Sequence, residues 1–118
     1  MRYIFILGFV FLSGCSTGNG TLYEWGGYQP ALVNYSKNKD ASAFETKVRE
    51  AVEKGERSKK VAPGLYAELG YLLYAKGEFS EASRYFGLEK SLFPESSLLM
   101  DKMIAGSASS QQKKGELQ

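Results

Sequence analysis

The chain contains no histidine, one cysteine and three prolines in 118 residues. The absence of histidine removes the commonest metal ligand and the usual general base. A lone cysteine, Cys15, excludes an intramolecular disulfide. Only carboxylates, hydroxyls and lysines remain for chemistry, so we expect no enzymatic activity, no cofactor and no metal site.

A strong charge of either sign is also absent, since 15 basic and 13 acidic residues leave a formal net charge of +2. Such a balance gives no electrostatic reason to expect a nucleic-acid partner. Residues 45–57 mix both signs, which is typical of a solvated helix face and argues against an acid/base pair. The residues are Glu45, Glu50, Glu53 and Glu56 among Lys47, Arg49, Lys54 and Arg57.

No apolar run is long enough to cross a bilayer, which takes about twenty residues. The run Ile4 to Leu12 follows Arg2 and leads through small residues to Gly14-Cys15. It therefore resembles a bacterial lipoprotein signal rather than an uncleaved transmembrane anchor. The resemblance implies cleavage between Gly14 and Cys15, diacylglycerol on the Cys15 thiol and acylation of the new amine.

The lipid defines where the protein is expected to act. Several acyl chains hold far more firmly than one myristoyl group, so residues 1–14 would be a signal peptide and Cys15 a permanent membrane anchor. Ser16 follows Cys15, where an aspartate would imply inner-membrane retention in enteric bacteria. The analogy implies the periplasmic face of an outer membrane. Residues 15–21 are rich in serine, glycine and threonine and predict a flexible tether.

Residues 22–106 carry helical spacing and predict an all-α domain of about five antiparallel helices. The polar residues 107–118 predict a disordered tail that follows a helix end at Gly106. The expected helix signals are, in order, Pro30, the Ser42/Glu45 capping box with a stop at Gly55, Pro63-Gly64, the turn Gly77-Glu78-Phe79, and Glu95 or Ser96.

A fixed spacing of large and small residues runs through residues 63–96, at Tyr66, Leu69, Gly70, Leu73, Ala82, Phe86 and Pro94. With this spacing the segment resembles one tetratricopeptide repeat, a helix-turn-helix unit of 34 residues. The same spacing, moved back by 34 residues, predicts a degenerate first repeat, which makes residues 63–96 the second repeat. A last helix would then cover the apolar face of the second repeat. The alternative is an ordinary helical bundle. The first repeat would use Leu32, Tyr35, Ser36, Val48 and Val52. The last helix would use Leu99, Met100, Met103 and Ile104.

Residue size predicts how the central helix pair packs. Gly70 and Ala82 are small where the two helices would approach closely, and large apolar residues, including Leu92, are expected to be buried. Glu89 stands where the repeat usually has a small residue. We expect Glu89 to weaken packing onto a following repeat, which would place this repeat near the end of its array.

The concave side of such repeats commonly binds proteins or peptides. The resemblance projects onto that side Gly64, Ala67, Tyr71, Tyr74 and Ala75. Tyrosines beside small residues make an amphipathic contact surface. Tyr71 and Tyr74 are therefore the main candidates for partner binding, and Ala67 and Trp25 are the further candidates. The alternative is that these aromatic rings pack within the domain.

A closer resemblance covers about residues 22–105 and is carried by the segments Tyr23 to Tyr28, Pro63 to Tyr74, Gly77-Glu78-Phe79, Tyr85-Phe86, Glu89-Lys90, Phe93 to Ser96 and Met100-Asp101. The chain is similar to small proteobacterial lipoproteins that share a domain of unknown function and are often encoded beside a lipoprotein related to the curli secretion channel. The resemblance implies a periplasm-facing member of an outer-membrane lipoprotein assembly, and the leading hypothesis for its role is an adaptor that binds a partner lipoprotein. Regulation of cell-wall synthesis and a carboxylate enzyme are the alternatives.

Overall fold

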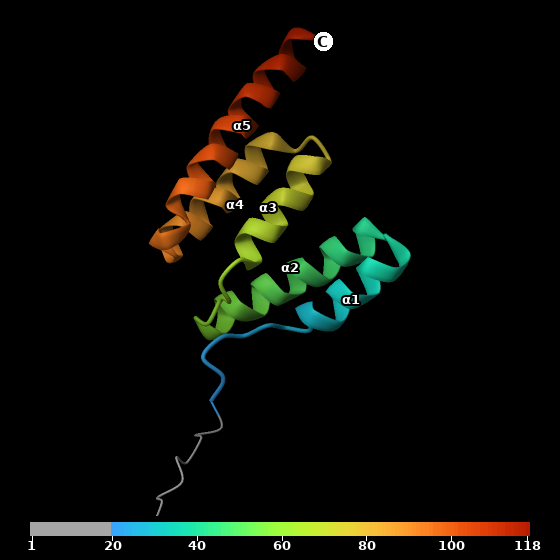
Figure 1. Ribbon diagram of the computed structural model, residues 1–118, viewed down its shortest axis with the longest axis vertical. Helices are drawn as coiled ribbons and strands as arrows, with labels where there is room; N and C mark the ends of the chain where they lie inside the picture. The colour runs from blue at the N-terminus through green and yellow to red at the C-terminus, as the bar shows by residue number, and fades with distance from the viewer. Residues whose placement is uncertain (1–19) are drawn as a thin grey trace, which may run out of the picture.

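The computed structural model describes residues 20–118, so Gly14, Cys15, the predicted signal peptide and most of the predicted tether lie outside the described residues. The described part is all-helical, as predicted, and contains no strand beyond an isolated bridge between Glu24 and Val61 (Figure 1). Its elements are α1 (Tyr28–Asn38), α2 (Ala41–Ser58), α3 (Leu65–Ala75), α4 (Phe79–Leu92), the short 3₁₀ helix η1 (Pro94–Ser96) and α5 (Ser97–Glu116).

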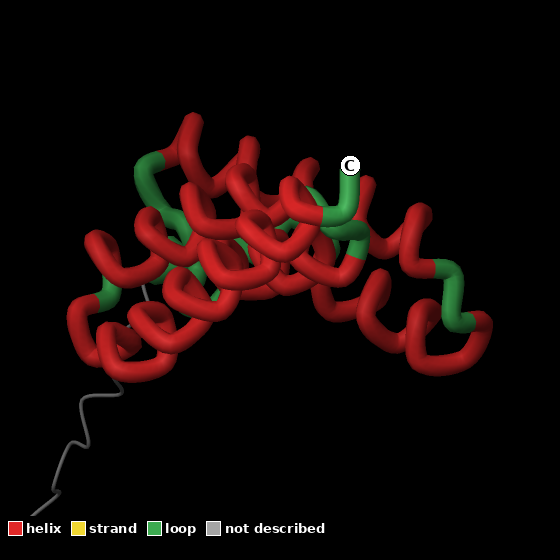
Figure 2. The backbone as a smooth tube through the Cα atoms, turned by 90° about the horizontal axis from the view of Figure 1, so that it is seen from above, coloured by secondary structure: helices red, strands yellow, loops and turns green. Residues whose placement is uncertain are grey.

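The helices stack in chain order, with α1 on α2, α2 on α3, α3 on α4, and α4 on α5. Short connections reverse the chain between α1 and α2 and between α3 and α4, which makes these pairs antiparallel hairpins. Seen from above, the helices follow a curved path rather than a closed bundle (Figure 2). The stack of five helices therefore agrees with the predicted architecture.

Both predicted boundaries of α2 are wrong. The helix is capped by Asp40, whose carboxylate accepts a hydrogen bond from the Ala43 amide at 2.9 Å, and not by Ser42. Aspartate is as good an N-cap as serine, so the earlier residue caps the helix. The helix also continues beyond Gly55 to Ser58. A Cβ at Gly55 would lie 2.8 Å from the Val61 Cα, so this glycine permits close approach of the chain instead of ending the helix.

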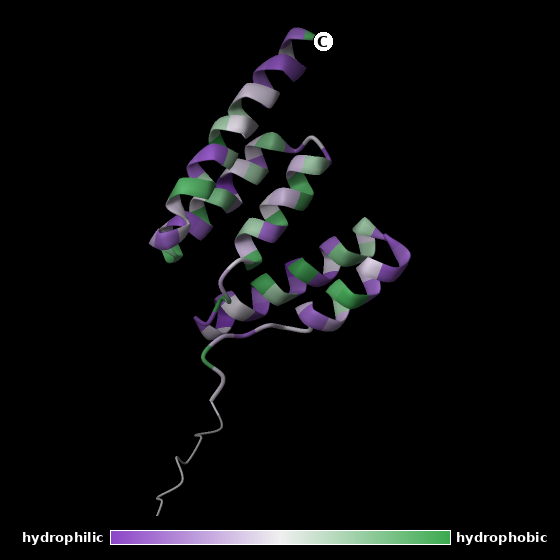
Figure 3. Ribbon diagram, in the orientation of Figure 1, coloured by the Kyte–Doolittle hydropathy of each residue, from purple (hydrophilic) through white to green (hydrophobic). Residues whose placement is uncertain are grey.

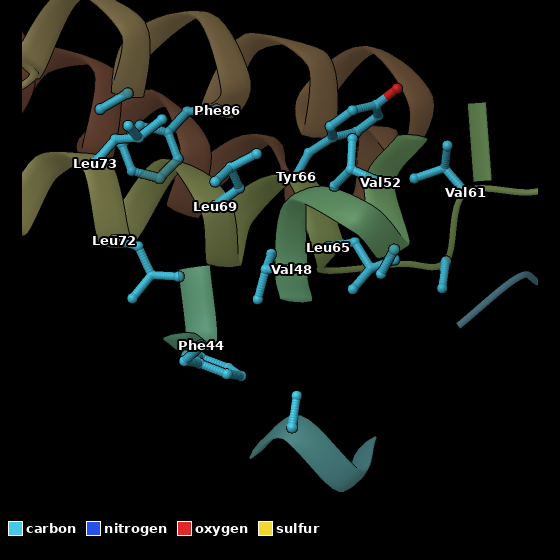
Figure 4. Packing of buried hydrophobic residues seen from close by; sticks show 14 of the residues in the cluster. Phe44, Val48, Val52, Val61, Leu65, Tyr66, Leu69, Leu72, Leu73 and Phe86 are labelled. Carbon is cyan, nitrogen blue, oxygen red and sulfur yellow. The ribbon is translucent and has the colours of Figure 1, made fainter. Parts of the chain in front are cut away.

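A continuous core runs through α2, α3 and α4 (Figure 4). The predicted core residues Tyr66, Leu69, Leu73 and Phe86 are all buried. The Gly70 prediction is also confirmed, because a Cβ there would lie 2.6 Å from Cε1 of the Phe86 ring and 3.2 Å from the Ala82 carbonyl oxygen. The labelled side chains in the figure are Phe44, Val48, Val52, Val61, Leu65, Tyr66, Leu69, Leu72, Leu73 and Phe86.

Two leucines that were expected to be buried are exposed. Leu92 is the last residue of α4, and the next residue, Phe93, is buried in its place. On α5 the covered stripe runs through Met100, Met103, Ile104 and Ser107. Leu99 precedes this stripe by one residue, or about 100° around the helix, and so faces solvent.

The predicted disordered tail is wrong, because α5 continues through Gly106 to Glu116. One buried side chain and two hydrogen bonds hold its second half. Ser107 is buried, the Ser110 hydroxyl lies 3.0 Å from the Tyr74 hydroxyl, and the Lys114 ammonium donates to the Gly77 carbonyl at 3.1 Å. The two hydrogen bonds join residues more than thirty positions apart in the chain, so local composition gave no sign of them.

Candidate functional site

The structure separates the two tyrosines that were the main candidates for partner binding. The Tyr71 side chain is 58% exposed. The Tyr74 ring instead packs edge-on against Phe79, with ring centroids 5.1 Å apart, and its hydroxyl contacts Ser110 on α5. Tyr74 is therefore half-buried between Phe79 and Ser110, and Tyr71 is the more accessible of the two tyrosines.

Tyr71 borders a groove between the α1–α2 hairpin and α3, which we name the tyrosine groove. Its volume is about 450 Å³. Tyr35 lines it from α1, and Ala75, which the repeat frame also placed on the binding side, lies on α3 with Tyr71. The lining residues are Tyr35, Ala41, Ser42, Glu45, Tyr71, Leu72, Ala75 and Lys76.

The α1 wall of the groove is held in place by aromatic packing. The Tyr35 ring stacks on the ring of Phe44, with centroids 4.8 Å apart and planes 6° from parallel. Phe44 is itself only 2% exposed and also contacts Tyr28. The Lys39 ammonium lies 6.0 Å from the Tyr35 ring centroid, within cation–π distance. This wall is therefore formed before any partner arrives.

An ion cluster forms the polar end of the groove. The Glu45 carboxylate pairs with Arg49 at 2.9 Å and with Lys76 at 3.0 Å, and Lys76 also pairs with Glu78 at 3.1 Å. Glu45 is buried, so its predicted place on a solvated face is wrong. The mixed-sign pattern could not reveal this burial, because the side chain that covers and pairs with Glu45 comes from the end of α3.

The pKa of Glu45 lies below its ordinary value. Burial acts to raise the pKa, but hydrogen bonds from Lys76 and Arg49, with the attraction of their charges, outweigh burial and lower it. A lowered pKa in the folded state means that Glu45 stabilises the fold at pH values above the ordinary value of 4.5. This contribution is lost as the pH falls through the lower, folded-state pKa.

We expect the variant Glu45→Gln to unfold more easily than the parent chain at pH 7, by about 1 kcal/mol, because Lys76 and Arg49 lose a charged partner. The difference should shrink as the pH falls below about 4.5. Urea titrations followed by circular dichroism at pH 7 and pH 3 measure it. Glu53→Gln is the matched control, since Glu53 is exposed on the same helix. An equal difference at both pH values would contradict the ion-cluster assignment.

The other two candidates do not line the tyrosine groove. Trp25 is 37% exposed and its ring lies 6.1 Å from that of Tyr28, so it packs beside the start of α1. Ala67 is half-buried, and its amide donates to the Glu89 carboxylate at 3.4 Å. These positions favour packing roles for both residues.

Glu89 has a role that the repeat frame did not predict. Its carboxylate is 3% exposed and accepts hydrogen bonds from the amides of Gly64, at 2.7 Å, and Ala67. It thus caps the first turn of α3 from α4, where the helix dipole favours a negative charge. Instead of loosening the contact with a following helix, Glu89 joins α4 to α3, and α5 packs along α4.

Two carboxylates, the buried Glu89 and the half-buried Glu68, have raised pKa values, and both have partners within the fold. Burial raises the pKa of Glu89 and of Glu68 more than their hydrogen bonds lower them. The partner of Glu68 is the Tyr28 hydroxyl at 3.5 Å. Within residues 20–118 no group of three potential ligand side chains is placed to hold a metal ion. None of the helices in that part of the chain is long and apolar enough to span a membrane.

Comparison with protein families assigns the helical domain to a family. Residues 22–103 match the model of the family described as "Domain of unknown function (DUF4810)". The chain belongs to this family. The DUF4810 match runs from the segment before α1 into α5 and includes every residue that lines the tyrosine groove. No curated protein and no solved structure matches the chain.

The sequence predicted a binding role for Tyr71 on the α3 side of the groove, but not for the lining residues on α1 and α2 or for Lys76. Tyr71 was found because repeat spacing placed it on the binding side. Tyr35 was expected only as a repeat signature residue, and Lys76 carried no signal, since lysine at a helix end is common. Leu32, assigned like Tyr35 to the first repeat, is 41% exposed.

Proposed function

We propose that this chain is a lipid-anchored adaptor that binds a segment of a partner protein in the tyrosine groove. The observation that carries the proposal is the exposed Tyr71 ring, which lies across the groove from the preformed Tyr35 wall. Tyrosine is enriched at the centres of protein interfaces, because it buries a large area and loses little conformational entropy. An exposed tyrosine in a concave site therefore supports a binding role.

The groove suits a short segment with one apolar or aromatic anchor side chain. Tyr35, Leu72 and Ala75 supply apolar area, while Lys76 and Glu45 supply charge at one end. Its volume of about 450 Å³ lies in the range of small-ligand pockets, which corresponds to a few side chains rather than a whole helix. We infer that a partner inserts an apolar residue beside Tyr71 and places polar groups near Lys76.

The partner that we propose is another lipoprotein in the same leaflet. Lipid on Cys15 would hold the domain at the periplasmic face of the outer membrane, and a shared membrane raises the effective concentration of two anchored proteins. The similarity to lipoproteins encoded beside a curli-channel relative supports a complex of that secretion type. Neither nucleic acid nor metal has a part in this proposal.

We expect Tyr71→Ala to reduce capture of the partner at least about tenfold, as for a residue at the centre of an interface. Stability should change by less than about 0.5 kcal/mol, because the side chain is exposed. Crosslinking in native cells, followed by affinity capture and mass spectrometry, measures the loss. Leu117→Ala is the control, since Leu117 is 89% exposed outside the groove. Unchanged capture would contradict the groove as the binding site, and recovery of a cell-wall synthase would favour the regulatory alternative.

We expect Cys15→Ala to leave an unlipidated precursor that is not cleaved at Gly14-Cys15. The precursor should migrate more slowly than the processed protein and fail to incorporate a fatty-acid label. Metabolic labelling with an alkyne fatty acid, together with gel mobility, measures both effects. Ser16→Ala is the control, because it leaves the cysteine intact. Equal mobility and equal labelling in the Cys15 variant would refute the lipid anchor.

A further inference from the structure

We propose that the end of the domain next to the tether lies on the phospholipid bilayer and inserts exposed leucines into its interface. The inference rests on the lipid anchor of the proposed function and adds an orientation to it. We call this end the anchor-end surface. It comprises the exposed leucines Leu22, Leu92, Leu98 and Leu99 with the basic residues Arg57, Lys59 and Lys60.

These leucines come from both ends of the domain sequence, but the fold brings them together. The Tyr23 ring packs edge-on against Phe93, with centroids 6.3 Å apart, so the first described segment lies against the α4–α5 junction. Leu22 and Leu92 line one hollow of about 510 Å³ there. Leu98 and Leu99 follow directly after η1, at the start of α5.

The exposure of these leucines is high for apolar side chains. Leu22 is 76% exposed, Leu98 74% and Leu99 59%. Apolar residues are concentrated in the first half of α5, and the second half is mainly polar (Figure 3). A set of exposed leucines at one end of a small domain indicates a surface that is covered in use.

The attachment of the tether identifies the bilayer as what covers this surface. The Glu24 amide donates to the Lys60 carbonyl at 2.7 Å, and the Lys60 ammonium donates to the Thr21 carbonyl at 3.1 Å. These bonds fix the start of the domain to the connection between α2 and α3. Thr21 lies six positions after Cys15, and even a fully extended chain of that length spans only about 20 Å. The anchor-end surface therefore always lies close to the lipid attached to Cys15.

The polar residues around the leucines are compatible with a bilayer interface. Arg57, Lys59 and Lys60 are exposed and can place their charged groups among lipid headgroups while their aliphatic stems cover apolar surface. Two acidic residues, Glu56 and Glu95, are exposed on the same side, and Arg57 also pairs with Glu53 at 3.8 Å. Since the basic excess is small, burial of the leucines provides most of the attraction.

The test uses the lipidated protein in vesicles of phosphatidylethanolamine and phosphatidylglycerol. With Cys15 blocked by lipid, Leu98→Cys provides a single thiol for a fluorophore, and Gln111→Cys provides the control position in the distal half of α5. Bromine-labelled lipids quench only fluorophores that reach the interface. Flotation of the same vesicles shows separately whether the protein is anchored.

We expect quenching at position 98 and none at position 111. In the Leu98→Cys protein, the further changes Leu22→Ser and Leu99→Ser should reduce the interface-bound population about tenfold or more, because each leucine loses its burial. Leu117→Ser should have no effect. Flotation with equal, weak quenching at both positions would overturn the inference alone and favour a protein occupant of the surface. Loss of flotation would overturn the anchor and the inference together.

Discussion

Replacing Gly70 with leucine should destabilise the domain by about 3 kcal/mol or more, through overpacking between α3 and α4. Even a single Cβ at this position would lie 2.6 Å from the Phe86 ring and 3.2 Å from the Ala82 carbonyl oxygen. Phe86 is 1% exposed and Ala82 is fully buried, so neither side chain has space to move aside. The two helices would have to separate. Because α5 packs on α4, the packing of α5 would also be disturbed.

Thermal unfolding followed by circular dichroism measures this effect, and we expect the melting temperature to fall by about 10 °C or more. Gly87→Ala is a matched control in α4, because a Cβ there meets no atom within 4 Å. Alanine is a better helix former than glycine by about 1 kcal/mol, so the control should stabilise the domain slightly. If Gly70→Leu melted within a degree or two of the parent chain, the close packing of α3 on α4 would be refuted.

The second large effect is expected from Glu89→Ala, which should cost about 2–3 kcal/mol. The substitution leaves the Gly64 and Ala67 amides at the start of α3 without their acceptor and opens a cavity between two helices. Glu89→Gln should cost less, because one acceptor oxygen remains. Glu95→Ala is the control, since Glu95 is exposed. Chemical denaturation at pH 7 compares the three variants.

The pH dependence of Glu89 should be opposite in sign to that of Glu45. Burial raises the pKa of Glu89 above its ordinary value of 4.5. The folded state then binds this proton more tightly than the unfolded state, so protonation stabilises the fold. The contribution of Glu89 to stability should increase as the pH falls through the raised pKa, whereas that of Glu45 decreases at low pH. A parent chain and a Glu89→Gln variant that respond identically to pH would contradict this assignment.

Two carboxylates in similar sequence surroundings thus have different roles, which local sequence could not distinguish. Glu45 and Glu89 both lie in amphipathic helices among residues of mixed charge. Glu45 pairs with Lys76 from α3, and Glu89 accepts from the first amides of that same helix. Glu45 on α2 lies at the C-terminal end of α3, and Glu89 on α4 lies at its N-terminal end. These positions are set by how the helices stack and not by the residues next to either carboxylate in the sequence.

The sequence by itself determined the all-α class, the number of helices and the close contact at Gly70. These features follow from the spacing of apolar residues and from turn residues, which act over a few positions of the chain. Only the tertiary structure decided that Tyr71 is exposed while Tyr74 is half-buried, and that α5 continues to Glu116. The physical reason is that α5 packs along α4 and reaches the end of α3, and the contacts that cover Tyr74 and hold the last turns of α5 join residues more than thirty positions apart.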